Sequence, residues 1–352
     1  MNGLGKRIAA LIAAQGPISV SQFMTIALHD PGAGYYATRD PFGRSGDFTT
    51  APEISQMFGE LLGLWIAQAW LDQGKPHARL VELGPGRGTL MNDALRATRA
   101  AMPEFLDSVE IVLVEASPTL QKIQAEALPA FTPRWTTHFD SPLSDRPLFL
   151  VANEFFDALP VNQYVRTEHG WHERMVTLDD TGALTFAVSP LTAPVGFIPA
   201  NRQAAPLSAF YATSPTSTAL MQQIAEIISR KGGAALIVDY GYGANAGFGE
   251  TLQAVRAHKF APVLDAPGEA DISAHVDFAA LTKAARASGA NAFGPISQGE
   301  LLTALGIAQR AQRLKQTREL ERLTSRDQMG TLFKALAIMP KNAPPPPGFA
   351  DA

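Results

Sequence analysis

The segment that most constrains how this chain can fold is VELGPGRGTL, residues 81–90. An apolar stretch leads into glycines at positions 84, 86 and 88, and a pattern typical of a helix follows. Glycine has no Cβ, so a turn built from glycines lets backbone N–H groups come close to a ligand. A strand, a glycine turn and a helix in this order predict one unit of a parallel α/β sheet with a ligand bound at the turn.

The spacing of the glycines separates two kinds of ligand. Dinucleotide-binding turns follow G-x-G-x-x-G, which would require a glycine at position 89, where the chain has Thr89. The chain instead has the pattern E-x-G-x-G-x-G, which resembles motif I of the class I S-adenosylmethionine methyltransferases. The cofactor-binding residues predicted at this turn are Glu82, Gly84, Pro85, Gly86 and Gly88.

The chemistry of S-adenosylmethionine fits this pattern, because the molecule has no phosphate but carries an ammonium, a carboxylate and a sulfonium. Glu82 can attract the cationic groups, and backbone donors of the turn can bind the carboxylate. Glu115 ends the next apolar run, VEIVLVE, where a carboxylate can accept hydrogen bonds from both ribose hydroxyls. The alternative is a plain tight turn, with Glu115 as a solvent-exposed strand end.

The remaining patterns alternate between strand and helix. Buried strands are expected at 78–83, 109–115, 147–153, 233–243 and 332–339, and helices at 4–14, 20–28, 53–72, 89–99, 117–128, 215–231, 276–288 and 299–323. Ser19 and Gln22 form a capping-box pattern at the start of the second helix. The expected fold class is α/β, a Rossmann-like class I methyltransferase fold in which helices cover both faces of a mostly parallel sheet.

Four regions are expected along the chain. Residues 1–55 form an N-terminal helical extension with a lid loop, and residues 161–214 form an inserted substrate-recognition subdomain. The insertion starts with an antiparallel hairpin, about 162–189, whose Tyr164 and Trp171 either anchor a partner or close a small satellite core. The methyltransferase core takes residues 56–160 and 215–340, and a Pro-rich tail at 341–352 is expected to be disordered or extended.

The segment 28–55 is rich in Gly, Pro, Asp and Thr and lacks sustained periodicity. Long loops of this kind inside a domain are often functional, and this one can fold over the cofactor as a lid. Thr49, Thr50 and Glu53 are predicted to hydrogen-bond S-adenosylmethionine or the substrate. Glu53 also has a purely structural explanation, because the helix dipole stabilises a carboxylate near a helix N-terminus.

Five longer stretches point to a family. LHDPGAGYY, GDFTTAPEISQMFGELLG, VELGPGRGTL, VANEFFDALPV and VDYGY occur in this order. Together they closely resemble the MidA family of methyltransferases, which is associated with assembly of respiratory complex I, over about residues 17–340. The resemblance implies a protein arginine methyltransferase that uses S-adenosylmethionine, with a complex I subunit or another protein as substrate. It implies the cytoplasm for a bacterial member and the mitochondrial matrix for a eukaryotic one.

Methylation of an arginine calls for carboxylates. The guanidinium has a pKa of about 12.5–13.8, so the site must orient one nitrogen and accept a proton. Glu154 and Asp157 are the predicted catalytic carboxylates, by analogy with arginine methyltransferases that hold guanidinium between two acidic groups, and Asn153 is expected to hold cofactor or substrate. Asp239 and Tyr240 end another strand at the same edge of the sheet. The alternative is that Asp157 starts a turn and Glu154 is a solvent-exposed cap.

Composition narrows the range of partners. The formal net charge of −4 gives no basic excess to drive nucleic-acid or anionic-membrane binding, and no apolar run is long enough for a membrane span. The absence of cysteine excludes disulfides and thiolate-ligated metals, and the histidines lack metal-site spacing. We therefore expect no nucleic acid, no metal and no membrane span, and either a monomer or a homodimer.

Two other functions stay open. An amino-group methyltransferase for nucleobases often carries Asn-Pro-Pro-aromatic after its fourth strand, whereas this chain has Asn153 followed by Glu154, Phe155 and Phe156. A non-catalytic assembly chaperone that binds S-adenosylmethionine only for its own structure is compatible with the composition. Transfer of a labelled methyl group to a protein would separate these alternatives from the arginine methyltransferase.

Overall fold

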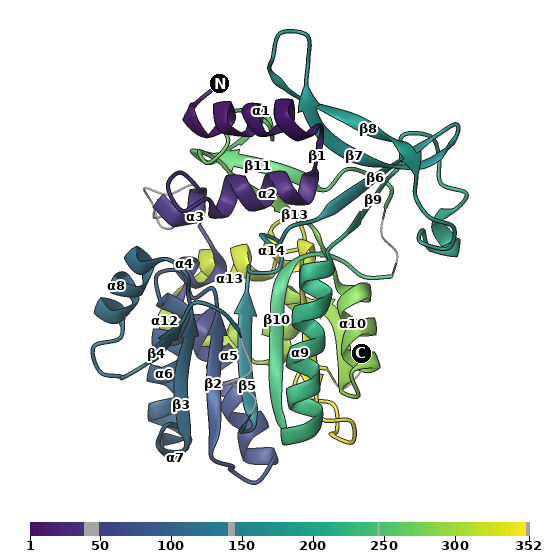
Figure 1. Cartoon of the computed structure of the whole chain (residues 1–352). Coiled ribbons are helices and arrows are strands. Elements are labelled where there is room, and N and C mark those ends of the chain that lie inside the picture. Colours follow the sequence, from purple (N-terminus) through teal and green to yellow (C-terminus); the bar gives the residue numbers. More distant parts are fainter. Residues whose placement is uncertain (39–48, 140–144, 245–246, 350–352) are drawn as a thin grey trace. The chain divides into compact units, whose positions relative to one another are not determined.

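The computed structural model describes residues 1–38, 49–139, 145–244 and 247–349 (Figure 1). The chain groups into two compact units, which are described one after the other. The sheet unit comprises Thr49–Asp157, Thr218–Ala244 and Val276–Ala352, and the N-terminal unit comprises Met1–Phe48, Ala158–Ser217 and Asn245–His275.

The sheet unit is built on strands in the order β15-β16-β10-β5-β2-β3-β4, with β14 paired to β10. Their bounds are β2 (Ala78–Leu83), β3 (Val109–Val114), β4 (Arg134–Thr136), β5 (Leu148–Asn153), β10 (Gly233–Tyr242), β14 (Val276–Asp277), β15 (Asn291–Ser297) and β16 (Phe333–Met339). Strands β10, β5, β2, β3 and β4 pair in parallel, whereas β16 and β15 pair antiparallel. The predicted α/β class is confirmed.

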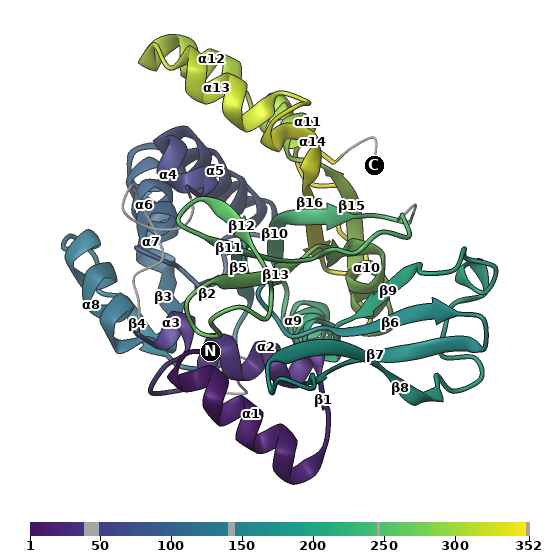
Figure 2. The same cartoon turned by 90° about the horizontal axis from the view of Figure 1, so that it is seen from above.

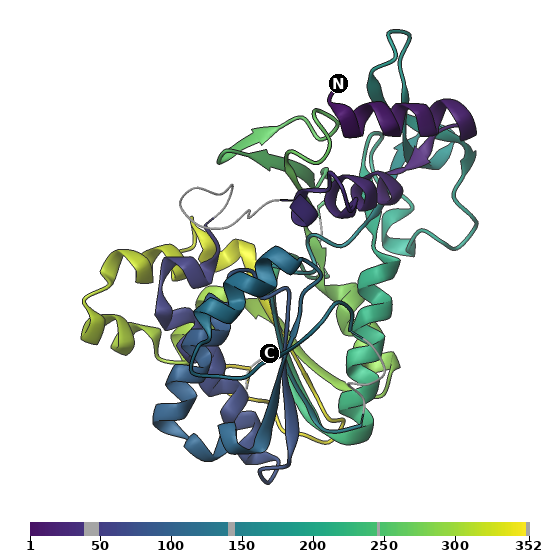
Figure 3. The same ribbon diagram turned by 60° about the vertical axis from the view of Figure 1, so that its left-hand side comes forward.

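Helices lie on both sides of this sheet, which Figure 3 shows nearly edge-on. They are α4 (Ala51–Ile54), α5 (Gln56–Asp72), α6 (Thr89–Ala101), α7 (Pro103–Ser108), α8 (Pro118–Ala127), α9 (Pro215–Lys231), α10 (Phe278–Ala287), α11 (Gln298–Ala304), α12 (Ile307–Leu314), α13 (Thr317–Thr324) and α14 (Met329–Leu332). Leu236 and Val238 of β10 share a core with Trp65 and Trp70 of α5. Because strand residues alternate between faces, this spacing places α5 on one face of the sheet.

Two expected helices are interrupted in the structure. The helix predicted at 53–72 breaks at Ser55, whose extended backbone (φ −161°, ψ 139°) separates α4 from α5. The helix predicted at 299–323 is three helices, because Gly306 (φ 87°) and Lys315 (φ 57°) adopt left-handed conformations between them. The leucine spacing that suggested a single helix runs across both breaks, so periodicity alone could not detect them.

The Pro-rich tail, predicted to be disordered or extended, has no helix or strand in its described part, residues 341–349, and packs against the sheet unit. Phe349 is fully buried, and its ring lies 6.3 Å from that of Trp65. The indole nitrogen of Trp65 donates a hydrogen bond of 2.9 Å to the carbonyl of Pro347. The Phe349 ring and the hydrogen bond to Pro347 therefore both anchor the tail against α5, and burying a large apolar side chain stabilises by about 1.5–3 kcal/mol.

The N-terminal unit combines three described α-helices and a short 3-10 helix (Ala200–Arg202) with antiparallel strands (Figure 2). Its elements are α1 (Gly3–Gln15), β1 (Ile18–Ser19), α2 (Val20–His29), α3 (Tyr35–Thr38), β6 (Asn162–Thr167), β7 (Gly170–Leu178), β8 (Leu184–Thr192), β9 (Phe210–Thr213), β11 (Leu252–Arg256), β12 (Lys259–Ala261) and β13 (Asp271–Ala274). The capping box of Ser19 and Gln22 at the start of α2 is confirmed. The central part of the expected lid, residues 39–48, lies outside the described residues.

The insertion forms more strands than a hairpin. Strand β6 pairs with both β7 and β9, and β8 pairs with β7, so residues 190–192 and 210–213, which follow the predicted hairpin, are strand as well. Tyr164 and Trp171 are buried with Ile198 in a small apolar cluster, which confirms the satellite core. Residues 247–275 were predicted to belong to the methyltransferase core but belong to the N-terminal unit. The reason is that β11 pairs with β12 and β13, and β13 packs on α2.

Within the described ranges, no helix combines the length and apolar character that a membrane crossing would require.

Candidate active site

The glycine turn after β2 has the backbone that the sequence pattern predicted. Gly84, Gly86 and Gly88 have φ values of 59°, 53° and 83°, in the left-handed region that favours glycine. The N–H of Gly88 donates to the carbonyl of Pro85 at 2.7 Å, which closes the turn. Gly88 then begins α6 without a side-chain cap. Gly88 has no side chain to cap the first N–H groups of α6, which leaves room for an anionic ligand group at this helix start.

Glu82 lies at the end of β2 and is almost completely buried, with 2% of its surface exposed. Burial raises the pKa of its carboxyl to about 8. Its Oε2 atom is buried and has no hydrogen-bond partner among the residues that the structure describes. A buried carboxyl in this state is stabilised in its charged form by a nearby cation. The residue fits the ammonium or sulfonium of S-adenosylmethionine.

Glu115 follows β3, one strand along the sheet from Glu82. Its Oε1 accepts from the N–H of Ser117 at 2.8 Å, and its Oε2 accepts from Nε2 of Gln124 at 3.1 Å. Burial raises the pKa of Glu115, while the hydrogen bonds from Ser117 and Gln124 act in the opposite direction. Each carboxylate oxygen has two lone-pair positions, so both oxygens can accept a further hydrogen bond from a ligand hydroxyl.

The turn after β5 carries the predicted catalytic residues. Glu154 has φ +50°, an unusual value for a residue with a side chain and a form of backbone strain that clusters at functional sites. Its Oε1 accepts from the N–H of Ala51 and from Nδ2 of Asn153, both at 3.2 Å. The Oδ1 of Asn153 is buried without a hydrogen-bond partner among the described residues. Burial, reinforced by the charge of Asp157, raises the pKa of Glu154 to about 7.

Asp239, three residues before the end of β10, binds the backbone of this turn. Its Oδ2 accepts from the backbone N–H groups of Phe155, Phe156 and Asp157 at 3.0–3.3 Å. Burial, together with the neighbouring Asp157 and Glu154 carboxylates, raises the pKa of Asp239. Asp239 is fully buried, so its position makes it a support for the turn.

Tyr240, the next residue of β10, supports the same turn. Its hydroxyl donates a hydrogen bond of 2.6 Å to Oδ2 of Asp157. The structure therefore brings Asp157, Asp239 and Tyr240 together, with Tyr240 holding the Asp157 carboxylate in place.

The short helix α4 connects the two turns. The N–H of Ala51 reaches Glu154, and Glu53 accepts a hydrogen bond from the hydroxyl of Thr89, the first residue of α6. Thr50 precedes α4, and its side chain makes no capping hydrogen bond. The structure thus brings Glu53 to the end of the glycine turn and places Thr49 and Thr50 at the start of α4, beside Ala51.

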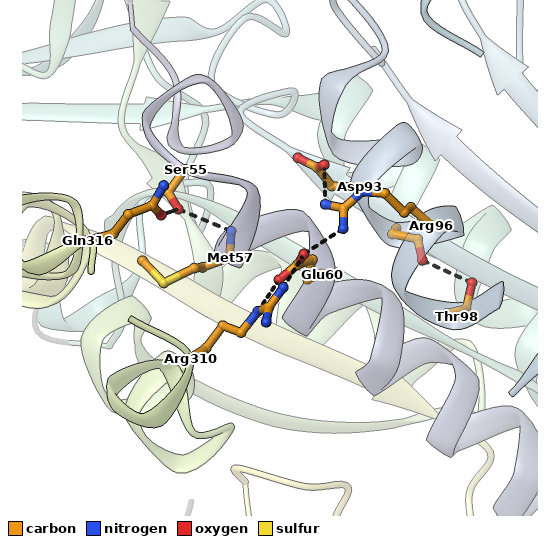
Figure 4. Close-up of polar contacts among 9 residues, drawn as sticks. Ser55, Met57, Glu60, Asp93, Arg96, Thr98, Arg310 and Gln316 are labelled. Atoms are coloured by element: carbon orange, nitrogen blue, oxygen red, sulfur yellow. Dashed lines mark hydrogen bonds and ion pairs between the residues drawn. The ribbon is translucent and has the colours of Figure 1, made fainter. Parts of the chain in front are cut away.

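A cluster of charged residues joins helices α5, α6 and α12 (Figure 4). The sequence analysis did not predict this cluster. Glu60 of α5 is 3% exposed. Its carboxylate accepts hydrogen bonds from Nε and Nη2 of Arg310 in α12, at 2.6 and 2.9 Å. Arg96 of α6 binds the same carboxylate at 2.9 Å. These arginines lower the pKa of Glu60 against the opposing effect of burial. Residues distant in sequence meet here, and no local motif marks them.

A second contact joins the same helices at the break between α4 and α5. The hydroxyl of Ser55 donates to Oε1 of Gln316 at 2.6 Å and accepts from the N–H of Met57 at 3.1 Å (Figure 4). Gln316 lies between α12 and α13. The segment that carries Ala51 and Glu53 is therefore tied to the C-terminal helices.

The site as a whole gathers carboxyl groups at the C-terminal ends of neighbouring strands, where open α/β sheets bind ligands. Glu82 is the penultimate residue of β2, whereas Glu115 and Glu154 directly follow β3 and β5. These carboxyl groups favour a cationic cofactor and a cationic methyl-accepting substrate. In the described ranges, no group of three or more His, Asp or Glu residues is placed to hold a metal ion.

A protein-family comparison agrees with this geometry. The model of a family of S-adenosyl-L-methionine-dependent methyltransferases matches residues 61–296. The chain belongs to this family of S-adenosylmethionine-dependent methyltransferases, as the resemblance to the MidA family predicted.

Individual relatives are more specific. The chain is 37% identical to the Danio rerio protein named "Protein arginine methyltransferase NDUFAF7, mitochondrial", over 95% of this chain and 86% of that protein. Identity to the Homo sapiens protein of the same name is 38%, over 84% of this chain and 71% of that protein. A crystal structure of a Burkholderia thailandensis protein bound to S-adenosyl-homocysteine has a TM-score of 0.87 and 30% identity, and covers 99% of this chain and 95% of that one.

Proposed function

We propose that this methyltransferase transfers the methyl group of S-adenosylmethionine to an arginine side chain of a protein. The names of the curated relatives support the arginine substrate. The observation that carries the proposal is Glu154, a half-buried residue whose carboxyl has a pKa raised to about 7, on a strained turn that α4 contacts through the N–H of Ala51. Such a group can be charged to bind a guanidinium and can still accept a proton near neutral pH.

The cofactor side of the site has a separate set of residues. We propose that Glu82 attracts the ammonium or sulfonium, that Gly84, Pro85, Gly86 and Gly88 present backbone groups, and that Glu115 binds the ribose hydroxyls. Thr49, Thr50 and Glu53 of the α4 region would complete this side. Bound S-adenosylmethionine supplies an electrophilic methyl group on a positively charged sulfur.

On the acceptor side, the chain must orient and deprotonate a guanidinium. We propose that Glu154 and Asp157 bind its planar N–H fork, which pairs well with carboxylates. The orphaned Oδ1 of Asn153 accepts a further N–H. Glu154 takes the proton that the attacking nitrogen loses as its bond to carbon forms. Asp239 and Tyr240 hold the turn so that both carboxylates keep their positions.

The substrate protein and the compartment stay predictions. We propose that the inserted segment 161–214 recognises the protein substrate, because insertions on sheet domains commonly carry specificity. A complex I subunit is the proposed partner, following the resemblance to the MidA family. The curated relatives are named mitochondrial. The cytoplasm of a bacterium or the mitochondrial matrix of a eukaryote remains the expected compartment, and monomer or homodimer the expected state.

The proposal is tested by incubating the purified protein with methyl-tritiated S-adenosylmethionine and an extract of cells that lack the gene. We expect label in one or a few proteins, recovered as methylarginine after hydrolysis, and none with Glu154→Gln. Label in another residue type would overturn the arginine assignment. S-adenosyl-homocysteine binding without transfer to any protein or nucleic acid would instead favour the non-catalytic assembly chaperone.

A further inference from the structure

Gln124 of α8 lies at the centre of the proposed cofactor site, although no sequence motif marks it. Its side chain is fully buried. Its Nε2 donates to the carbonyl of Gly86 at 2.8 Å and to Oε2 of Glu115 at 3.1 Å. Its Oε1 accepts from the indole nitrogen of Trp135 in β4 at 2.8 Å. One side chain thus joins the glycine turn, the carboxylate after β3 and the neighbouring strand.

We propose that Gln124 is a positioning residue for the cofactor, which fixes the Glu115 carboxylate relative to the glycine turn so that it can bind the ribose hydroxyls. This inference rests on the proposed role of Glu115. An isolated carboxylate on a strand end can rotate about its side-chain bonds, and each rotamer presents its lone pairs in a different direction. Two donors on two different oxygens, Ser117 N–H and Gln124 Nε2, restrict Glu115 to one orientation.

The position requires two hydrogen-bond donors and one acceptor on a side chain of this length, and only glutamine supplies them. The primary amide of glutamine has two N–H donors and one carbonyl acceptor, and here all three have protein partners. Glutamate would offer no second donor, and methionine would fill the space without any hydrogen bond. A simpler explanation is that Gln124 only satisfies the buried indole of Trp135. That explanation does not require the two bonds from Nε2 to the cofactor-binding turns.

The test compares affinities for S-adenosyl-L-homocysteine and for S-(2′-deoxyadenosyl)-L-homocysteine by calorimetry. A hydroxyl donating to a charged acceptor is worth about tenfold to a hundredfold in affinity, so the intact protein should prefer the first ligand by about that factor. In Gln124→Met we expect this preference to fall to about threefold or less, with weaker binding of the full ligand. A preference equal to that of the unaltered protein would overturn the inference.

Matched variants test the positioning role of Gln124 separately from the proposed ribose-binding role of Glu115. Gln121→Met makes the same change one helical turn earlier, where Nε2 of Gln121 donates only to the backbone carbonyl of Glu115 at 2.7 Å. It should keep the hydroxyl preference. Glu115→Ala should abolish it, and a preference that survived in Glu115→Ala would refute the ribose role of Glu115 itself.

A second substitution at the same position serves as a control in case Gln124→Met does not fold. Gln124→Glu keeps an acceptor for Trp135 and the shape of the side chain, and it has no donor for Gly86 or Glu115 once it is ionised. Because burial and the Glu115 carboxylate raise the pKa of a glutamic acid at this position, the variant is measured over a pH series that reaches its ionised form. If Gln124→Met does not fold, Gln124→Glu decides the question, and we expect the same loss of hydroxyl preference. A folded Gln124→Glu protein with unchanged preference would show that Gln124 acts on stability alone.

Discussion

Gly84 of the glycine turn lies directly against the ring of Phe155 in the turn after β5. A Cβ placed on Gly84 would come within 2.7 Å of Cδ2 of Phe155, a separation that real Cβ atoms essentially never show. Phe155 is the residue after Glu154, and its N–H is held by Asp239. The two turns of the site therefore pack as one structure, and a change in either should be felt by both.

This contact predicts the effect of Gly84→Ala. The substitution adds a methyl group that meets Phe155 and also places an alanine at φ +59°, so we expect a cost of about 2–4 kcal/mol in the free energy of unfolding. Calorimetry should show weakened S-adenosyl-homocysteine binding. The matched control is Gly74→Ala, at φ +83° with open space around it. Gly74→Ala should show only the backbone cost, about 1 kcal/mol, and equal losses in both variants would contradict the packing argument.

Glu154→Gln tests the acceptor side. The variant keeps the shape of the side chain but cannot accept a proton, so turnover should fall at least about a hundredfold while the affinity for S-adenosyl-homocysteine stays nearly unchanged. In the unaltered enzyme, kcat/KM should rise with pH through about 7, because Glu154 must be deprotonated. Glu126→Gln, an exposed position on α8, is the control. Near-normal turnover in Glu154→Gln would remove this residue from the mechanism.

The buried carboxyl of Glu82 predicts a pH dependence of stability. Its pKa is about 8 in the folded protein against 4.5 for a free side chain, so the folded state binds more protons between these values. The ligand-free protein should therefore lose stability as pH rises through this window. Glu154, with a pKa of about 7, adds to the slope in the lower part. In Glu82→Gln, the curve of Tm against pH should be flatter; an unaltered curve would mean that Glu82 does not titrate there.

The ion pairs of Glu60 predict that removing Arg310 lowers the stability of the protein. Arg310→Met removes a bidentate partner of the buried Glu60. Because Arg310 itself is about one-third exposed, we expect a loss of about 1–3 kcal/mol, below that of a fully buried pair. Urea denaturation measures it. Arg313→Met, on the exposed side of the same helix, should change stability by less than about 0.5 kcal/mol, and a similar loss in both variants would argue against the pairing.

Local patterns predicted the parts of the protein that are encoded locally. The turn at 84–88, the run that ends at Glu115 and the capping box at Ser19 each lie within one short segment, where glycine spacing, apolar runs and cap residues are visible. The end of β5 was visible in the same way, and it marked Glu154 and Asp157 as candidates. The burial of Asp157 and the raised pKa of Glu154 depend on neighbours from other segments.

The features that the sequence could not predict arise from contacts between distant segments. Gln124 looks like any helical glutamine until Trp135 and Gly86 lie beside it. Phe349 stands in a Pro-rich tail, and only the presence of Trp65 explains its burial. The breaks at Gly306 and Lys315 follow a leucine spacing that continues through them, so the tertiary structure decides where each helix ends.

The pairing of Glu60 with Arg310 spans 250 positions of the chain. During synthesis, the helix that carries Glu60 leaves the ribosome long before its arginine partner from α12 exists. The sheet follows the same order, since β16 joins the edge of β10 only when the chain is nearly finished. The Glu60 carboxylate is therefore made early in synthesis, but it receives its bidentate arginine partner only near the end of translation.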